Sequence, residues 1–87
     1  MTAEEIVARH RKRPFKGLRI YVSDGQSYEI THPDLMFVTR TIVHIALPPL
    51  DSHGIPTGGS VYVDPVHITR IEPLNGERRP SRKSRRT

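Results

Sequence analysis

The chain has 87 residues, 14 lysines and arginines against nine acids, a formal net charge of +5 and no cysteine. This length allows one domain at most, close to the lower size at which an apolar core is stable without further cross-links. The lack of cysteine excludes a disulfide framework and a thiolate zinc site, and no apolar stretch is long enough to span a bilayer.

The first element that the sequence predicts is a helix over residues 3–12. Thr2 followed by Glu5 fits a capping box, in which the two side chains satisfy each other's free backbone N–H groups. Acids in the first turn and bases in the last turn complement the helix dipole. Pro14 disfavours helical geometry at the residue before it, so the helix should stop near residue 12.

A β-hairpin follows. Apolar residues alternate over residues 18–22, which is typical of a half-buried strand. Asp24-Gly25 is the residue pair of a two-residue type I′ turn, and residues 26–31 return as the second strand.

The chain up to residue 74 then predicts further short strands separated by turns. His32-Pro33-Asp34 is a turn, because proline presets φ and aspartate hydrogen-bonds nearby backbone. Asp64-Pro65 fits the start of a tight or 3₁₀ turn, and residues 48–60 form a long loop with three prolines and three glycines. We expect strands over residues 35–39, 41–47, 60–63 and 67–71.

One short helix followed by five or six short strands predicts a mainly β fold. Such strands close most economically as a small, strongly bent antiparallel barrel, which leaves few free edges. A turn before the last strand is typical of SH3-type barrels and a leading helix is typical of Sm-like ones, so both topologies stay open. We expect a single domain over residues 1–74 and a disordered basic tail over residues 75–87, which lacks apolar side chains to bury.

Several motifs resemble a group of short, uncharacterised bacterial proteins. These share an Arg-Pro-Phe opening, a strand ending in Asp-Gly and a His-Pro turn, which are Arg13-Pro14-Phe15, Asp24-Gly25 and His32-Pro33 here. The resemblance covers roughly residues 3–73 and implies no particular activity. Similarity to Sm-like RNA binders is at fold level only, because Asp64-Pro65 stands where they carry a basic dipeptide, so their RNA pocket is not implied.

Positive charge is concentrated at the two ends of the chain. Six of the last ten residues are basic, whereas residues 17–77 hold three bases and seven acids. A cationic arm of this kind predicts contacts to nucleic-acid phosphates, and a tail that only aids solubility is the alternative. The candidate nucleic-acid-binding residues of the tail are Arg78, Arg79, Arg82, Lys83, Arg85 and Arg86.

Arg9, Arg13 and Lys16 extend this candidate footprint at the other end of the chain. Complementarity to the helix dipole and a solvated helix face are the alternative explanation of these bases. If all six tail charges engaged duplex DNA, log K would fall against log salt with a slope of about −5. The tail has no aromatic residue on which unpaired bases could stack. We therefore expect binding with little sequence specificity.

No motif predicts catalysis, a cofactor or a metal. The five histidines are far apart, without the short spacings of zinc ligands. Asp51-Ser52-His53 contains the residue types of a hydrolase triad, but contiguous residues do not easily form the line from acid to base to nucleophile. We predict a protein that is not an enzyme, with no small-molecule substrate.

Two functions remain as hypotheses. The first is a non-enzymatic nucleic-acid-binding module with a cationic tail. The second is a protein-interaction or assembly module, binding a protein partner or a second copy through a barrel face or a sheet edge. Because acids and bases rather than an apolar signal region open the chain, we expect a cytoplasmic location. The candidate interface residues, which lie opposite the predicted core, are Arg19, Tyr21, Ile42, His44 and Tyr62.

Overall fold

The computed structural model describes residues 1–74 of the chain. The predicted tail, residues 75–87, lies outside the described residues. The six basic tail residues predicted to contact nucleic acid therefore have no structural account, and the predicted disorder of the tail stays a prediction. None of the helices in the described part has the length and apolar character needed to cross a membrane.

Helix α1 spans Ala3–Arg11 and ends one residue earlier than predicted. The capping box is confirmed: the Glu5 N–H donates to the Thr2 hydroxyl at 3.1 Å, and the Thr2 N–H donates to the Glu5 carboxylate at 2.9 Å. Ile6 is fully buried in the core. The helix therefore begins at a defined residue and places one fully buried apolar side chain in the core.

The first sheet has the strand order β2-β1-β6, formed by β1 (Leu18–Val22), β2 (Ser27–Ile30) and β6 (Ile68–Pro73), all antiparallel. The predicted hairpin is confirmed, but its two-residue type I′ turn is wrong. Tyr21 pairs with Ser27, and the Val22 N–H donates to the Gln26 carbonyl, so the loop has three residues. Gly25, at φ 93°, supplies the left-handed residue of this longer turn.

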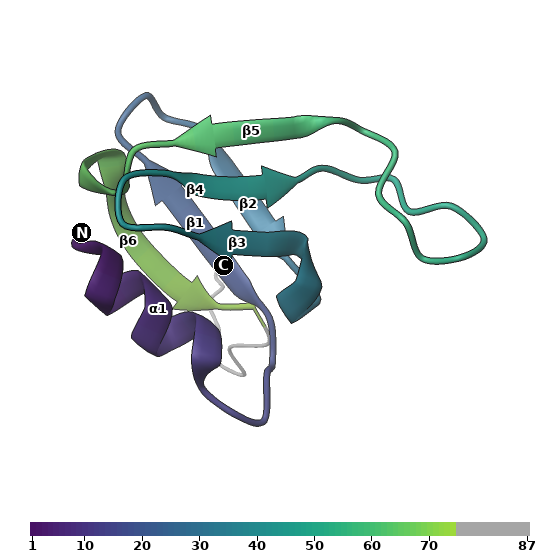
Figure 1. The fold of residues 1–87 in the computed structure, drawn as a ribbon, viewed down its shortest axis with the longest axis horizontal. Helices are drawn as coiled ribbons and strands as arrows, with labels where there is room; N and C mark the ends of the chain where they lie inside the picture. Colours follow the sequence, from purple (N-terminus) through teal and green to yellow (C-terminus); the bar gives the residue numbers. More distant parts are fainter. Residues whose placement is uncertain (75–87) are drawn as a thin grey trace, which may run out of the picture.

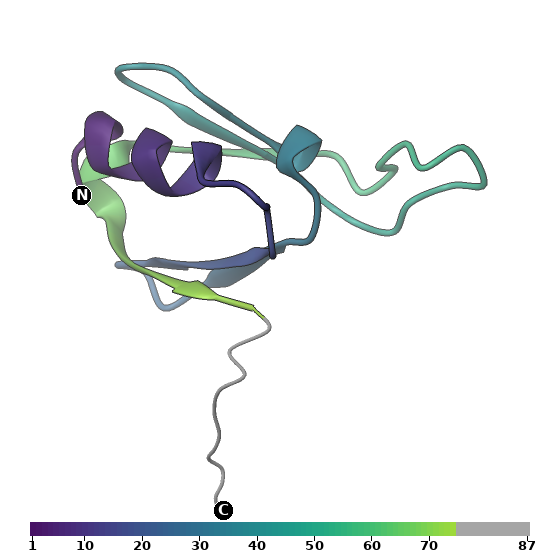
Figure 2. The ribbon, with the colours of Figure 1, turned by 90° about the horizontal axis from the view of Figure 1, so that it is seen from below.

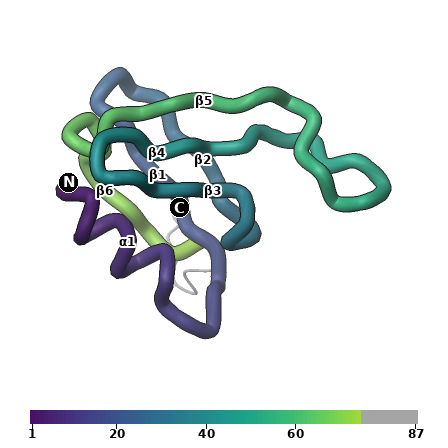
Figure 3. Tube along the Cα trace, viewed as in Figure 1, coloured from purple at the N-terminus to yellow at the C-terminus, as the bar shows by residue number. Residues whose placement is uncertain are grey.

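The second sheet has the order β3-β4-β5, formed by β3 (Met36–Val38), β4 (Val43–Ala46) and β5 (Ser60–Val63), again antiparallel. Figure 1 shows the two sheets crossing one another, with α1 lying beside β6. Figure 2 shows them as two layers, one above the other, with the helix along one side. The β4–β5 connection extends away from both layers as a long loop (Figure 3).

Two 3₁₀ turns carry the chain from one sheet to the other. The first, η1 (Pro33–Leu35), connects β2 to β3, and the second, η2 (Pro65–His67), connects β5 to β6. The predicted turns at both places are confirmed. Asp64 caps η2 by accepting the Val66 N–H at 3.0 Å, and the His32 ring accepts the Asp34 N–H at 3.4 Å ahead of η1.

The predicted closed barrel is wrong for the described residues, which form two separate three-stranded sheets. The physical reason lies in the two turns. Pro33 and Pro65 have no N–H to donate, and the 3₁₀ geometry redirects the chain before a ladder can continue from one sheet into the next. The mainly β class and the short leading helix are confirmed.

The core lies between the two layers and is entirely apolar. The first sheet, the second sheet, η1 and α1 all contribute to it, and no charged or polar side chain is buried among residues 1–74. Removal of this area from water is the main force holding the layers together. The buried side chains are Ile6, Ile20, Ile30, Leu35, Met36, Val43, Ile45 and Ile68.

Candidate nucleic-acid interface

The carboxylates of residues 1–74 make ion pairs and hydrogen bonds to other groups of the chain. Three are ion-paired, Glu4 with Arg40, Glu29 with Arg19, and Glu72 with Arg70. The other five lie at caps and turns, where most accept backbone N–H groups. These are Glu5, Asp24, Asp51 and Asp64, together with Asp34, whose Oδ2 lies 3.8 Å from His32 Nδ1.

Bases of the described residues divide differently. Three are the ion-paired arginines just named, and the remaining five are exposed and make no ion pair to any carboxylate within residues 1–74. These five all lie within one stretch of eight residues at the end of α1 and just after it. We call them the basic cluster: Arg9, Arg11, Lys12, Arg13 and Lys16.

Two members of the basic cluster also cover the end of the helix. The Arg9 guanidinium donates to the Glu5 carbonyl at 3.1 Å, and Arg13 donates to the carbonyls of His10 and Lys12 at 2.9 and 3.1 Å. The Arg13 contacts, which lie at the C-terminal end of α1, support the helix-dipole explanation left open by the sequence. The Arg9 and Arg13 contacts use only part of each guanidinium, which has five N–H donors, so further acceptors can still be bound.

The segment that carries the basic cluster is held in place by aromatic contacts. His10 lies 2.8 Å, Nε2 to O, from the Pro33 carbonyl in η1, and its ring meets Phe15 edge-on at 6.2 Å between centroids. Phe15 itself packs against the core. The cations are therefore displayed on a segment anchored at both sides.

The point where the described chain ends lies beside this cluster. Leu18 pairs with Pro73 across β1 and β6, and the Leu74 N–H donates to the Gly17 carbonyl at 3.2 Å. Gly17 adopts φ +87° and lies directly against the Leu74 side chain. The fold thus brings residue 74, four residues before Arg78, the first base of the tail, next to the end of the basic cluster.

The five predicted interface residues do not form one surface. Arg19 and Tyr21 lie on the first sheet and are engaged there. Arg19 pairs with Glu29, and this hydrogen bond raises the pKa of the Arg19 guanidinium. The Tyr21 hydroxyl donates to Glu72 at 3.0 Å, and the Arg70 guanidinium stacks 4.0 Å from the Tyr21 ring centroid.

His44 and Tyr62 lie on the second sheet, directly opposite one another on β4 and β5. The third ring of this surface is Phe37 on β3, which pairs with His44 from the other side and was missed by sequence reasoning. The centroid of His44 lies 5.7 Å from that of Phe37 and 4.8 Å from that of Tyr62. We call Phe37, His44 and Tyr62 the aromatic row; Ile42 lies in the adjoining turn.

A signal for Phe37 was present in the sequence. Met36 and Val38 on either side are apolar. Because side chains alternate along a strand, Phe37 lies on the opposite face from these two residues. What the sequence lacked was the pairing of β3 with β4, which decides that Phe37 faces outward beside His44.

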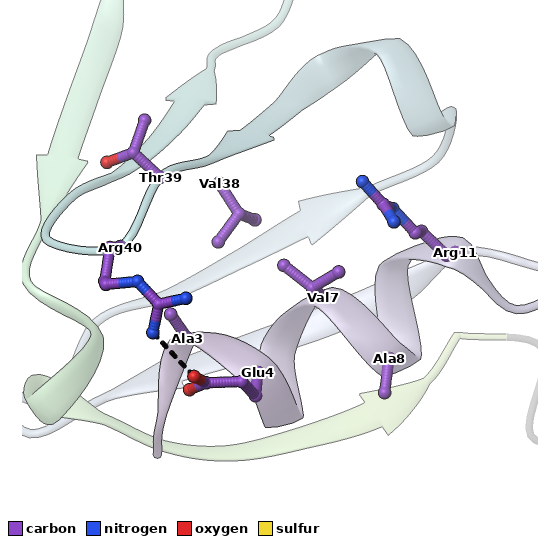
Figure 4. Close-up of a pocket in the computed structure, with 8 residues that line it drawn as sticks. All are labelled: Ala3, Glu4, Val7, Ala8, Arg11, Val38, Thr39 and Arg40. Carbon is purple, nitrogen blue, oxygen red and sulfur yellow. Dashed lines mark hydrogen bonds and ion pairs between the residues drawn. The ribbon is translucent and has the colours of Figure 1, made fainter.

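A groove of about 510 Å³ runs between α1 and the end of β3. Its floor is apolar, with Val7 and Val38 facing each other, and Arg11 lies at one end (Figure 4). Arg40 lies at the other end and donates to the Glu4 carboxylate at 2.6 Å. This hydrogen bond lowers the pKa of the Glu4 carboxyl.

The groups considered for catalysis or metal binding serve other roles. The Asp51 carboxylate accepts the backbone N–H groups of His53 and Ile55, so it stabilises the loop and does not orient the His53 ring. Ser23 Oγ lies 3.2 Å from His67 Nδ1 at an exposed position. Among residues 1–74 no three histidine or acidic side chains come together where they could hold a metal ion.

No protein-family model, curated protein or solved structure matches this chain. The resemblance to a group of short bacterial proteins therefore stays a prediction. Function has to be argued from the charges and surfaces of the chain itself.

Proposed function

We propose that this chain is a non-enzymatic, cytosolic binding module that holds nucleic acid through its phosphates, with little sequence specificity. One observation carries the proposal: the last described residue, Leu74, is hydrogen-bonded to Gly17, directly after the basic cluster. The chain therefore continues toward its second group of bases from a point beside the first. Together the two groups hold eleven bases that can act on one polyanion.

The two sheets form the body that displays these charges. The strands β2-β1-β6 form one sheet and β3-β4-β5 the other, and η1 connects β2 to β3. In this arrangement the antiparallel pairing of β1 and β6 brings Pro73 opposite Leu18, two residues after the last member of the basic cluster. The body sets the orientation, and the cations supply the affinity.

The test is fluorescence anisotropy with generic labelled DNA and RNA at several salt concentrations between about 50 and 200 mM. Deletion of residues 78–87 removes six bases and should lower the salt slope by about 5. The triple variant Lys12→Gln/Arg13→Gln/Lys16→Gln should lower it by about 3, because each phosphate contact contributes about 0.9.

A matched control is available within the chain. The triple variant Arg19→Gln/Arg40→Gln/Arg70→Gln makes the same change in net charge but removes only bases that are already ion-paired. Its salt slope should stay close to that of the unmodified protein. Equal slopes for the two triple variants, or no binding near physiological salt, would refute the proposal.

A second function, a protein-interaction or assembly module, is favoured by one specific observation. The Phe37 and Tyr62 rings are 65% and 67% exposed on the same sheet face, and exposed rings of this kind are common at protein interfaces. Light scattering separates the two proposals. A stable oligomer without nucleic-acid affinity would favour assembly.

A further inference from the structure

The aromatic row crosses the outer face of the second sheet. Phe37, His44 and Tyr62 come from three adjacent strands and are register partners, so they stand side by side. The contacts between their rings are tilted by 66° and 65°, which leaves the two outer rings largely open. A ring that is two-thirds exposed keeps a π-face available to another flat group.

Small residues border the aromatic row on one side, and a turn borders it on the other. Ala46 and Ser60 form the next register pair on the same face. On the other side lies the turn closed by Thr39 and Ile42, whose N–H and carbonyl are bonded at 2.8 Å. The carboxylate nearest in sequence, Asp64, accepts the Val66 N–H. Because Phe37 and Tyr62 are 65% and 67% exposed, neighbouring side chains cover only about a third of each.

The helix that carries part of the basic cluster contacts the strand at one end of the aromatic row. Phe37 is on β3, an edge strand of its sheet that contacts α1 (Figure 1). The groove between β3 and α1 has Arg11 of the basic cluster at one end, whereas Arg40 at the other end is ion-paired with Glu4 (Figure 4). A single strand that contacts the basic cluster at the end of α1 can continue toward β3, the strand that carries Phe37.

We propose that the aromatic row is a stacking platform for unpaired bases, so that the ligand of this module is single-stranded nucleic acid. This inference rests on the proposed function and names the substrate class. Phe37 and Tyr62 are two strand spacings apart, about 9.5 Å, which gives each ring room for one base. Aromatic side chains on other sheets stack two or three bases in this way.

The chemistry favours single strands over a duplex. Every unpaired base has a π-face and stacks on an aromatic side chain with little dependence on sequence. The bases of a duplex already stack on one another, and a flat sheet face does not reach them through a groove. A duplex would therefore use the cations alone, whereas a single strand uses both the cations and the rings.

The test compares a labelled single-stranded oligothymidine with a duplex of the same length, by anisotropy with the full chain. Phe37→Leu/Tyr62→Leu removes the outer rings from exposed positions, and should weaken single-strand binding roughly tenfold or more. Binding to the duplex should change by less than about twofold. Phe37→Tyr/Tyr62→Phe keeps both rings and should bind both ligands as the unmodified protein does.

Leu50→Ala/Ile55→Ala is the matched control for exposed apolar area, because both residues lie in the long β4–β5 loop away from the aromatic row. It should leave both affinities unchanged. The proposal is overturned if the leucine variant, shown by circular dichroism to be folded, binds the single strand normally. It is equally overturned if the variant loses affinity for both ligands alike, or if it changes a dimer into a monomer.

The two proposals fail in different ways. If the basic-cluster variant loses affinity while the leucine variant does not, phosphate binding stands and the stacking platform is wrong. If the unmodified protein binds neither ligand, both proposals are wrong.

Discussion

Two neighbouring glycines at the base of the β4–β5 loop are constrained by different physics, and substitution should separate them. A Cβ built on Gly58 would lie 2.0 Å from the Pro48 carbonyl oxygen and 2.9 Å from that of Leu47. Gly59 has nothing within 4 Å of its Cβ position but adopts φ +81°. Gly58 is therefore required by space, and Gly59 by backbone conformation.

The size of each effect follows from the contacts. Ordinary contact begins at 3.4 Å, so Gly58→Ala requires the Pro48 backbone to move by about 1.4 Å. That movement breaks the Gly58 N–H to Leu47 O bond at 3.0 Å and the Leu47 N–H to Gly59 O bond at 2.9 Å. At about 0.5–1.5 kcal/mol each, the loss is about 1–3 kcal/mol. Gly59→Ala should cost about 1–2 kcal/mol, the price of a left-handed non-glycine residue.

Asparagine distinguishes the two causes, because it tolerates the left-handed conformation better than alanine does. Gly59→Asn should be more stable than Gly59→Ala, whereas Gly58→Asn should be no better than Gly58→Ala. Thermal unfolding followed by circular dichroism is the measurement, and a loss of about 2 kcal/mol lowers Tm by roughly 8–16 °C. An unchanged Tm for Gly58→Ala, or asparagine and alanine behaving alike at residue 59, would refute this reasoning.

Three further predictions concern the helix and the first sheet. Ile6→Ala should lower the free energy of unfolding by about 2–5 kcal/mol and Ile6→Val by only about 0.5–1.5 kcal/mol, since Ile6 is fully buried; equal losses in urea titrations would contradict a core role. The pKa values of Glu4 and Glu5 are lowered by hydrogen bonds from Arg40 and from the Thr2 backbone. Their stabilisation is therefore present above the unfolded value of 4.5 and is lost as pH falls through the folded values. In the Glu4→Gln/Glu5→Gln variant, Tm should therefore fall less steeply as the pH is lowered. An equally steep fall in the variant and the unmodified protein would contradict this role of the two carboxylates. Tyr21→Phe removes the 3.0 Å hydrogen bond to Glu72 and should lower the free energy of unfolding by about 0.5–1.5 kcal/mol in the same titrations. An unchanged free energy would show that the Arg70 stack alone holds the ring.

Features that depend on neighbouring residues were predictable from the sequence. The capping box of α1, the hairpin of β1 and β2, and both 3₁₀ turns follow from residues within a few positions of each other. The wrong prediction of a two-residue turn between β1 and β2 also concerns neighbouring residues. Asp24-Gly25 suits a two-residue turn, but Gly25 alone in the left-handed region also closes a three-residue loop, and cross-strand register decided between them.

Features that depend on distant pairing were not predictable. The prediction of a closed barrel was wrong because the apolar pattern does not show where the hydrogen-bonded pairing of strands ends. In the structure it ends at the proline turns. The aromatic row needed the register of three strands, and the meeting of the basic cluster with Leu74 needed the pairing of β1 with β6. The β1–β6 pairing, for example, joins Leu18 to Pro73, which are more than fifty positions apart in the sequence.

Charge placement, rather than charge count, is what makes the described part of the chain suited to a polyanion. Residues 1–74 hold eight acids and eight bases, so their formal balance predicts no preference. The acids, however, are either ion-paired or dispersed singly over caps and turns, whereas five bases are gathered between residues 9 and 16. With a Debye length of about 10 Å at 0.1 M salt, neighbouring members of that cluster act together while isolated carboxylates elsewhere are screened from it. A polyanion approaching the end of α1 therefore experiences a cationic surface on a body whose formal charges balance.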